Sequence, residues 1–172
     1  MTSNSGGGPR ILGSLAVAGG TGVVRMEDRI DAEIGEVWSA LTDPARLARW
    51  YGEVSGELRL GGEYRAHLHA SGWEGTGRVT ACEPPRHLQV AAAEPGQPEH
   101  VGEVTLVASG HQTQLVWEER GVRADLLFAF GAGIQVHVED LVAHLAGRER
   151  CDAGQRFAEL EPAYTALAAQ LA

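Results

Sequence analysis

The sequence predicts an α+β fold in which two short helices precede an antiparallel meander of strands and one long helix follows it. Near the N-terminus, residues 34–51 carry apolar side chains at helical spacing, with a sharp stop at Pro44. The middle of the chain alternates between apolar and polar residues, which is the pattern of strands with one buried face. Residues 124–146 then return to a period of 3.6 residues, which predicts the long helix.

The N-terminal segment differs in composition from the rest of the chain. Residues 1–10 are rich in Ser, Gly and Asn, so we expect a disordered segment there. Residues 11–172 are expected to form a single domain, which is the default for a chain of 172 residues. Within that domain, residues 11–18 and 23–30 predict two strands, and the glycine-rich turn between them is typical of a hairpin.

A pair of short helices follows this hairpin. The first runs to about Leu41, and Asp31 is a candidate for its N-cap. Asp43 suits the N-cap of the second helix, and Pro44 suits its first position, because a missing N–H costs nothing there. We expect Trp50 to pack this second helix against the body of the domain.

The strands of the meander are separated by turn signals such as Gly61-Gly62 and Pro84-Pro85. Gly75 and Gly77 interrupt one strand, which suggests a bulge or a strong bend. Period-two alternation assigns one side of every strand to the interior. The predicted inward residues are Tyr64, Ala66, Leu68, Ala70, Val79, Ala81, Leu88, Val90, Ala92, Val104, Leu106, Thr113, Leu115, Trp117 and Glu119.

The long helix is predicted from one apolar stripe that ends near Gly147, a residue suited to a helix stop. A last helix is expected over residues 155–171, where Pro162 should break or restart it. The stripe on the long helix consists of Leu127, Phe130, Ile134, Val138, Leu141 and Leu145.

Charge and composition disfavour two classes of partner. The formal net charge is −9 and all 14 basic residues are arginine, so neither nucleic acid nor an anionic membrane is expected as a partner. The apolar run 11–18 is too short to span a bilayer, and no export signal is recognisable. Cys82 and Cys151 have no metal-binding or redox spacing, so we expect a cytoplasmic protein with two reduced cysteines.

Several motifs carry a family resemblance that covers about residues 11–170. The motifs are Val37-Trp38-x-Ala40-Leu41-Thr42-Asp43-Pro44, Leu47-x-x-Trp50, Gly61-Gly62-x-Tyr64, Gly77-Arg78-Val79, Glu83-Pro84-Pro85-x-x-Leu88, Thr113-x-Leu115, residues 133–145 and Leu160-x-Pro162-x-Tyr164. With these motifs, the chain resembles the SRPBCC superfamily, also called START-like or birch-allergen-like, and within it the branch named for activators of the heat-shock chaperone ATPase.

This resemblance implies a helix-grip fold, in which a curved antiparallel sheet of six or seven strands wraps around the long C-terminal helix. It also implies a hydrophobic cavity between the sheet and that helix, and it says little about activity. One position departs from the family. Where relatives often have Trp after the glycine of the long helix, this chain has Ile134, and a smaller side chain leaves more room in the cavity.

Two groups of histidines have spacings that a metal site could use, and the second group could also serve acid–base chemistry, but we expect neither role. His67 and His69 share the polar side of a strand, but no third ligand is recognisable. His137, Asp140 and His144 recur at i, i+3 and i+7, so they share one side of the long helix. Such a group is more typical of the solvated back of an amphipathic helix.

Glu119 is the sharpest candidate for chemistry. It follows Thr113, Leu115 and Trp117 in phase, so its side chain could point into the cavity. Burial there would raise the pKa of the carboxyl and suit it to acid–base work. The competing interpretation, which we favour at this point, is that Glu119 lies at the frayed end of its strand and meets water.

The leading hypothesis is that the protein binds a small hydrophobic or aromatic ligand between the sheet and the long helix. An enzyme of polyketide cyclase, aromatase or hydratase type is the alternative, and it requires polar groups that converge in the cavity. A protein-interaction or chaperone-regulating module is the second alternative, and it requires an exposed apolar patch. No catalytic motif is recognisable, no cofactor is expected, and formation of a homodimer stays open. The predicted ligand-binding residues are Tyr64, Leu68, Trp73, Val79, Val90, Leu115, Trp117, Glu119, Phe130, Ile134 and Val138.

Overall fold

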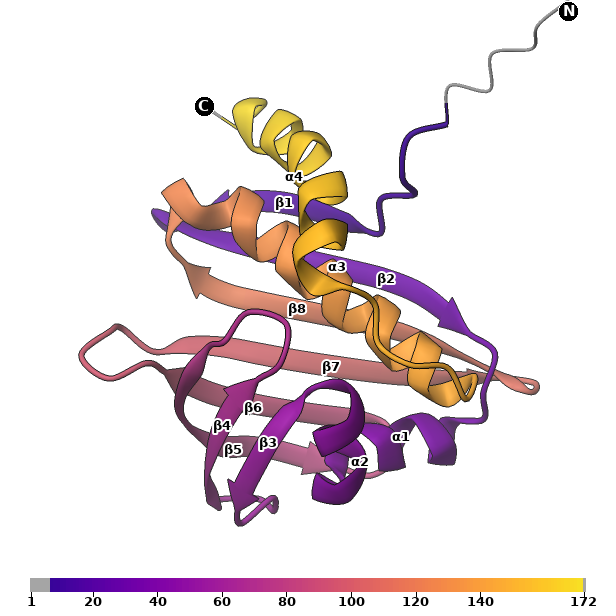
Figure 1. The fold of residues 1–172 in the computed structure, drawn as a ribbon. Helices are drawn as coiled ribbons and strands as arrows, with labels where there is room; N and C mark the ends of the chain where they lie inside the picture. Colours follow the sequence, from indigo (N-terminus) through magenta and orange to yellow (C-terminus); the bar gives the residue numbers. More distant parts are fainter. Residues whose placement is uncertain (1–6, 172) are drawn as a thin grey trace, which may run out of the picture.

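The computed structural model describes residues 7–171, and one curved antiparallel sheet accounts for all of the strands in that range (Figure 1). The strand order is β1-β2-β8-β7-β6-β5-β4-β3, so the first hairpin is placed beside the last strand. This sheet has eight strands, which is more than the resemblance implies. The strands are β1 (Gly13–Ala18), β2 (Thr21–Ile30), β3 (Gly52–Gly56), β4 (Glu63–Leu68), β5 (Glu74–Glu83), β6 (His87–Ala93), β7 (His100–Ser109) and β8 (Gln112–Val122).

The helices cover one face of this sheet. The long helix α3 crosses the face, and α4 passes over α3 toward the end of the molecule where β1 lies (Figure 1). The predicted order of a helix pair, a meander and a long helix is therefore confirmed. The helices are α1 (Ile34–Thr42), α2 (Pro44–Trp50), α3 (Leu127–Leu145) and α4 (Ala153–Ala169), and a 3-10 turn, η1 (Ala124–Leu126), precedes α3. Residues 1–6 of the segment expected to be disordered lie outside the described residues.

The junction of α1 and α2 follows the predicted capping pattern. Asp43 caps α2 by accepting a hydrogen bond from the backbone N–H of Ala45 at 2.9 Å, and Pro44 occupies the first helical position. Trp50 is 1% exposed, and its indole N–H donates to the carbonyl of Ala40 at 2.9 Å. The prediction for Asp31 is wrong: the N-cap of α1 is Glu33, and its side chain makes no capping hydrogen bond.

The predicted bulge lies elsewhere in β5. The ladder between β4 and β5 continues without a register shift through Gly75 and Gly77, whereas β5 and β6 change register between Val79 and Ala81. Because one extra residue reverses the alternation, Ala81 pairs with Gln89 on the outer face and the inward prediction for Ala81 is wrong.

The two glycines of β5 instead make room for aromatic rings. A Cβ atom on Gly77 would lie 2.3 Å from the ring of Tyr64, and one on Gly75 would lie 2.5 Å from the ring of Trp73. Both rings are therefore held close to the strand on the side that faces α3, which places them at the wall of the cavity described below.

Helix α3 is buried on more sides than its apolar stripe predicts. Of the stripe residues, Leu127, Ile134, Val138 and Leu141 are buried, and so are the polar residues Gln135, His137 and Asp140. The prediction of a solvated back is wrong because α4 and the connection before it cover one side of α3, while His137 lies on the sheet side, against the rings of Trp117 and Tyr51. Residues 124–145 are long and apolar enough to span a membrane, but most of this segment is buried in the core, as in many soluble folds.

Helix α4 runs through Pro162 without a break, contrary to the prediction. Pro162 is exposed, whereas Leu160 and Tyr164 are fully buried against the domain. The hydroxyl of Tyr164 donates to Oε1 of Gln135 at 2.6 Å and accepts from the N–H of Gly13 at 3.1 Å. These contacts join α4, α3 and β1, and we attribute the continuity of the helix across Pro162 to them.

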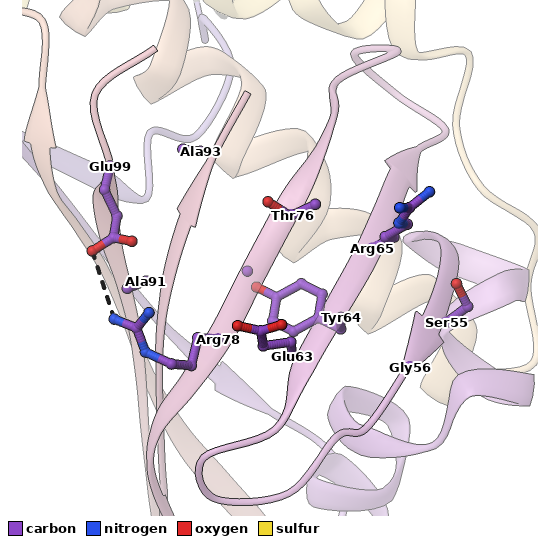
Figure 2. A pocket seen from close by; sticks show the side chains of 11 residues that line it. Ser55, Gly56, Glu63, Tyr64, Arg65, Thr76, Arg78, Ala91, Ala93 and Glu99 are labelled. Carbon is purple, nitrogen blue, oxygen red and sulfur yellow. Dashed lines mark ion pairs between the residues drawn. The ribbon is translucent and has the colours of Figure 1, made fainter. Parts of the chain in front are cut away.

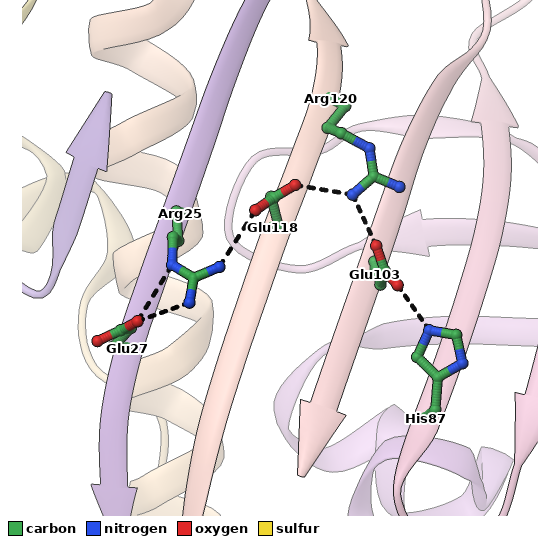
Figure 3. A network of polar contacts seen from close by, with 6 residues as sticks. All are labelled: Arg25, Glu27, His87, Glu103, Glu118 and Arg120. Carbon is green, nitrogen blue, oxygen red and sulfur yellow. Dashed lines mark hydrogen bonds and ion pairs between the residues drawn. The ribbon is translucent and has the colours of Figure 1, made fainter. Parts of the chain in front are cut away.

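The outer face of the sheet carries a chain of charged side chains across β2, β8, β7 and β6 (Figure 3). Glu118 contacts Arg25 at 3.4 Å and Arg120 at 2.7 Å, and Glu103 links Arg120 to His87, each at 2.6 Å. Pairs this exposed contribute little stability individually. Their position matters more, because Glu118 on the outer face places the next residue, Glu119, on the inner face.

Replacing Trp50 with Ala should remove the main anchor of α2. A buried Trp truncation typically costs about 3–5 kcal/mol, and here the carbonyl of Ala40 also loses its donor. Thermal and denaturant unfolding of Trp50→Ala, with the exposed neighbour Arg49→Ala as the control, measures the difference. An unchanged melting temperature in Trp50→Ala would contradict the assignment.

Both cysteines are free and partly buried. Cys82 lies in β5 and Cys151 lies between α3 and α4, so an intact-mass measurement with a thiol reagent should add two labels after unfolding without reductant. Labelling of neither cysteine would indicate a disulfide and would overturn the expectation of reduced thiols.

Candidate functional site

A cavity of about 580 Å³ lies between α3 and the concave face of the sheet. Its walls come from the C-terminal end of α2, strands β4, β6, β7 and β8, helix α3 and the start of α4. The predicted ligand-binding residues that line this cavity are Tyr64, Leu68, Trp73, Val90, Trp117, Glu119, Phe130 and Ile134. The lining residues that were not predicted to bind ligand are Tyr51, Ala66, Ala70, Ser71, Gly72, Ala92, Glu94, His100, Ala129, Gly133, Val136, His137, Ala153, Gly154 and Phe157.

A second, smaller cavity of about 110 Å³ adjoins the first beneath α1 and α2. Tyr51, Tyr64, Val90, Trp117 and Glu119 line both spaces. Val79 lines only the smaller one, whereas Leu115 and Val138 line neither and are fully buried core residues. The structure thus brings most of the predicted residues to one place and assigns two of them to packing.

Glu119 lies at the junction of the two cavities. Strand β8 continues beyond it to Val122, and its partners across the sheet are Val24 and Gly102, so the interpretation of a frayed strand end is wrong. Gly102 leaves space for the carboxyl group, because a Cβ atom there would lie 3.0 Å from Oε1 of Glu119. A larger residue at position 102 would push the carboxyl away from the sheet.

Only one of the two carboxyl oxygens of Glu119 has a hydrogen-bond partner. Its Oε1 accepts a hydrogen bond from the indole N–H of Trp117 at 3.0 Å, and its buried Oε2 has no hydrogen-bond partner. Nε2 of His100 is 3.6 Å from Oε2, which is too long for a hydrogen bond. Burial raises the pKa of Glu119 to about 7, although the Trp117 hydrogen bond and the charge of Arg120 act in the opposite direction.

His137 lines the cavity, whereas the helical pattern predicted that its side chain faces solvent. It is 6% exposed, its ring stacks on Trp117 at an interplanar angle of 13°, and it meets the ring of Tyr51 edge-on. Nδ1 of His137 is buried without a hydrogen-bond partner, and burial lowers the pKa of the imidazole to about 4. The ring is therefore neutral near pH 7. The spacing i, i+3 from Ile134 could have placed it at the cavity.

The other members of the predicted helical group point elsewhere. Asp140 is 2% exposed and accepts from the backbone N–H of Cys151 at 2.9 Å, which fastens the connection before α4. His144 lies 3.2 Å from the guanidinium of Arg46. The solvent prediction is thus wrong for Asp140 as well as for His137, and these side chains do not converge on one site.

The tyrosines of the cavity are neutral hydrogen-bonding groups. Burial raises the pKa of both Tyr51 and Tyr64 well above the usual value, and the carboxylate of Glu119 raises each further. Sequence reasoning missed Tyr51 because it follows the last residue of α2, where no periodicity assigns a direction. It also missed His100, whose pKa is lowered by burial and which lies at the first position of β7.

Among residues 7–171, no arginine or lysine lines the main cavity, whose charged residues are Glu94 and Glu119. Arg120 follows Glu119 on β8, but its guanidinium lies on the outer face and pairs with Glu103 and Glu118 (Figure 3). An anionic group in this cavity would therefore face carboxylates with no cation to offset its desolvation.

Two further hollows lie on the surface. One, of about 470 Å³, opens on the outer face of β4 and β5, where Arg78 pairs with Glu99 at 4.0 Å and where Glu63, Tyr64 and Arg65 also line the hollow (Figure 2). The other, of about 630 Å³, lies beside α2 and the end of α3 and contains exposed arginines. Both are polar and open, and neither contains a buried polar group without a partner.

His67 lies in β4 and His69 follows the strand, and their side chains have different surroundings. His67 is exposed, and Nε2 of the half-buried His69 lies 2.7 Å from the carbonyl of Ala48. Among residues 7–171, no three His, Cys, Asp or Glu side chains lie close enough together to hold a metal ion.

Comparisons with known proteins agree with this architecture. Two solved structures show 28% sequence identity: CalU16 from Micromonospora echinospora, with a TM-score of 0.74 over 91% of this chain and 96% of that chain, and DynU16, a protein of the dynemicin biosynthetic locus, with a TM-score of 0.68 over 76% of this chain and 50% of that chain. A Bordetella parapertussis protein shows 25% identity and a TM-score of 0.70 over 96% and 94% of the two chains.

A comparison with curated proteins gives no significant match. The profile of the family described as "Activator of Hsp90 ATPase homolog 1-like protein" matches residues 31–146, which span α1 to the end of α3. The chain therefore belongs to this family, within the SRPBCC superfamily of helix-grip folds.

Proposed function

We propose that this protein binds a small hydrophobic molecule in the cavity between α3 and the sheet. The observation that carries the proposal is a cavity of about 580 Å³ with mostly apolar walls, whose lining includes two residues that each hold a buried polar atom without a hydrogen-bond partner, Oε2 of Glu119 and Nδ1 of His137. Pockets for small molecules typically combine apolar walls with a few polar groups that orient the ligand.

The cost of these polar groups supports a role in binding. Buried polar atoms are almost always hydrogen-bonded, and leaving one unpaired costs about 1–3 kcal/mol. The space itself is also costly, because cavity walls lose packing contacts. A ligand that fills the cavity and supplies the missing hydrogen bonds would recover both losses.

A cyclase or hydratase activity is the second candidate. A carboxyl group with a pKa of about 7 can accept and donate a proton near neutrality, and neutral tyrosine hydroxyls lie in the same cavity. One structural relative belongs to the dynemicin biosynthetic locus. An enzyme of this type would lose turnover in Glu119→Gln, whereas a binding protein would have no turnover to lose.

The protein-interaction alternative has less support. The large apolar side chains that are exposed within residues 7–171 are Val17, Leu60, Val107 and Leu171, and they come from four separate parts of the chain. Such isolated residues are normal on a protein surface.

Filling the cavity should abolish binding without harming the fold. Gly133 lines the cavity in the middle of α3, and a Cβ atom there meets open space. Gly133→Phe should therefore weaken binding of N-phenyl-1-naphthylamine, an uncharged fluorescent probe, by about tenfold or more, while removal of a mid-helix glycine favours the helix.

The matched control is Gly35→Phe in α1, another helical glycine with open space around its Cβ position. It should leave the affinity for the probe unchanged. Absence of saturable binding to the unsubstituted protein, or equal binding by both variants, would contradict the proposed site.

The stability of the empty protein should also depend on pH through Glu119. Its folded pKa of about 7 exceeds the ordinary value of 4.5, so the unfolded chain releases this proton first as the pH rises. Folding is therefore penalised progressively between about pH 4.5 and 7, by about 3 kcal/mol once both states are ionised. Glu119→Gln removes the penalty, so urea unfolding should show it to gain stability over the parent at pH 8 relative to pH 5. A difference that is independent of pH would contradict the raised pKa.

A further inference from the structure

The inference concerns the chemical class of ligand and rests on the proposed function. We propose that the cavity selects hydrophobic ligands that carry a protonated amine, and that the free oxygen of Glu119 forms the ion pair with that ammonium group. The walls would hold the apolar part of the ligand, and the junction with the smaller cavity would hold the charged nitrogen.

The first observation is the position of the free carboxylate oxygen. Oε2 of Glu119 is buried and has no hydrogen-bond partner, and the carboxyl group is fixed through Oε1 by the indole N–H of Trp117. Gly102 prevents a clash with the neighbouring strand. A carboxylate that is already oriented needs little rearrangement to accept a hydrogen bond from a ligand.

The second observation is the set of aromatic rings around this carboxylate. Tyr51 lies 6.1 Å from Trp117 and 5.0 Å from His137 between ring centroids, and Tyr64 lines both cavities at the same junction. Aromatic faces attract cations through their quadrupole, and an aromatic cage is a common site for ammonium groups. A carboxylate that shares a cavity wall with such rings is better matched to an ammonium than to an uncharged polar group.

The third observation is the absence of a competing cation among the residues that line the cavity. Every group that faces Glu119 is neutral or acidic near pH 7. Burial lowers the pKa of His137 and His100, the two tyrosines are protonated, and Glu94 at the rim is acidic. Arg120 is held on the outer face by Glu103 and Glu118. A ligand ammonium would therefore be the first positive charge to reach the carboxylate.

Proton linkage follows from this pairing. Without ligand, Glu119 with a pKa of about 7 is protonated in about half of the molecules at pH 7. An ammonium ligand binds the ionised form, so it should release protons, and its affinity should rise by about tenfold between pH 6 and pH 8. A ligand that accepts a hydrogen bond from protonated Glu119 would show the opposite trend.

The test uses three probes with the same naphthalene ring: 1-naphthylmethylamine, 1-naphthylmethanol and 1-naphthoate. Calorimetric titration at pH 6, 7 and 8, in two buffers of different ionisation enthalpy, gives the affinities and the protons released. We expect the amine to bind at least about tenfold more tightly than the alcohol at pH 8, since hydrogen bonds to charged groups are the stronger ones, and the naphthoate to bind weakest.

Two variants test whether the preference for the amine depends on the carboxylate of Glu119. Glu119→Gln keeps an acceptor for Trp117, and should remove the preference for the amine, the pH dependence and the proton release, while the alcohol binds within about threefold of its original affinity. Glu118→Gln, the next residue on the outer face of β8, should change none of these. The pH dependence of the unsubstituted protein tests the idea independently of any variant.

The outcomes separate this inference from the function on which it rests. If the alcohol binds as tightly as the amine, if the naphthoate binds best, or if amine affinity falls with pH, the amine assignment is wrong and the hydrophobic cavity stands. If Glu119→Gln keeps the amine preference, Glu119 is not the anchor. If no probe binds in any state, the proposed function and the inference are both contradicted.

Discussion

The fold keeps helix α3 above the sheet and leaves a cavity beneath it. The hydrogen bonds of the buried Gln135 side chain hold the helix in that position. Its Oε1 accepts hydrogen bonds from the N–H of Leu12 and the hydroxyl of Tyr164, and its amide N–H groups donate to the carbonyl of Arg10 and to Glu139. All four bonding positions of the amide are used, so the buried group is satisfied. One helix is thereby tied to the N-terminal segment and to α4.

With α3 anchored in this way, small residues decide where the cavity lies. Gly77 accommodates the ring of Tyr64, Gly102 accommodates the carboxyl of Glu119, and Gly133 leaves open space on α3. Ala66 and Ala92 on the sheet leave further volume at the same wall. Close packing is the normal state of a protein interior, so an opening produced by small residues on four strands and one helix is a property of the whole arrangement rather than of one position.

The polarity of the cavity follows from the same arrangement. The outer face of the sheet pairs its charges with one another, whereas the inner face holds one carboxyl with an unpaired oxygen next to neutral imidazole and phenol groups. Burial is what separates the two environments: it barely affects the exposed pairs, and it moves the pKa of Glu119 toward neutrality. The family membership is compatible with this chemistry but does not specify it.

Local pattern was sufficient for the elements and their order, because period and capping act within a few residues, as Asp43, Pro44 and the stripe on α3 illustrate. It was also sufficient for part of the cavity, since alternation along β4 and β8 places Tyr64, Trp117 and Glu119 on one face. The direction of a side chain beyond a register change was not predictable: Ala81 lies on the outer face because β5 gains one residue before it. The burial of His137 and Asp140 was likewise decided by tertiary structure, because His137 packs against Trp117 and Tyr51 and the connection before α4 covers Asp140. Oε2 of Glu119 lacks a hydrogen-bond partner because no neighbouring element of the assembled fold places a donor beside it. That property belongs to the tertiary structure and cannot be read from a local pattern.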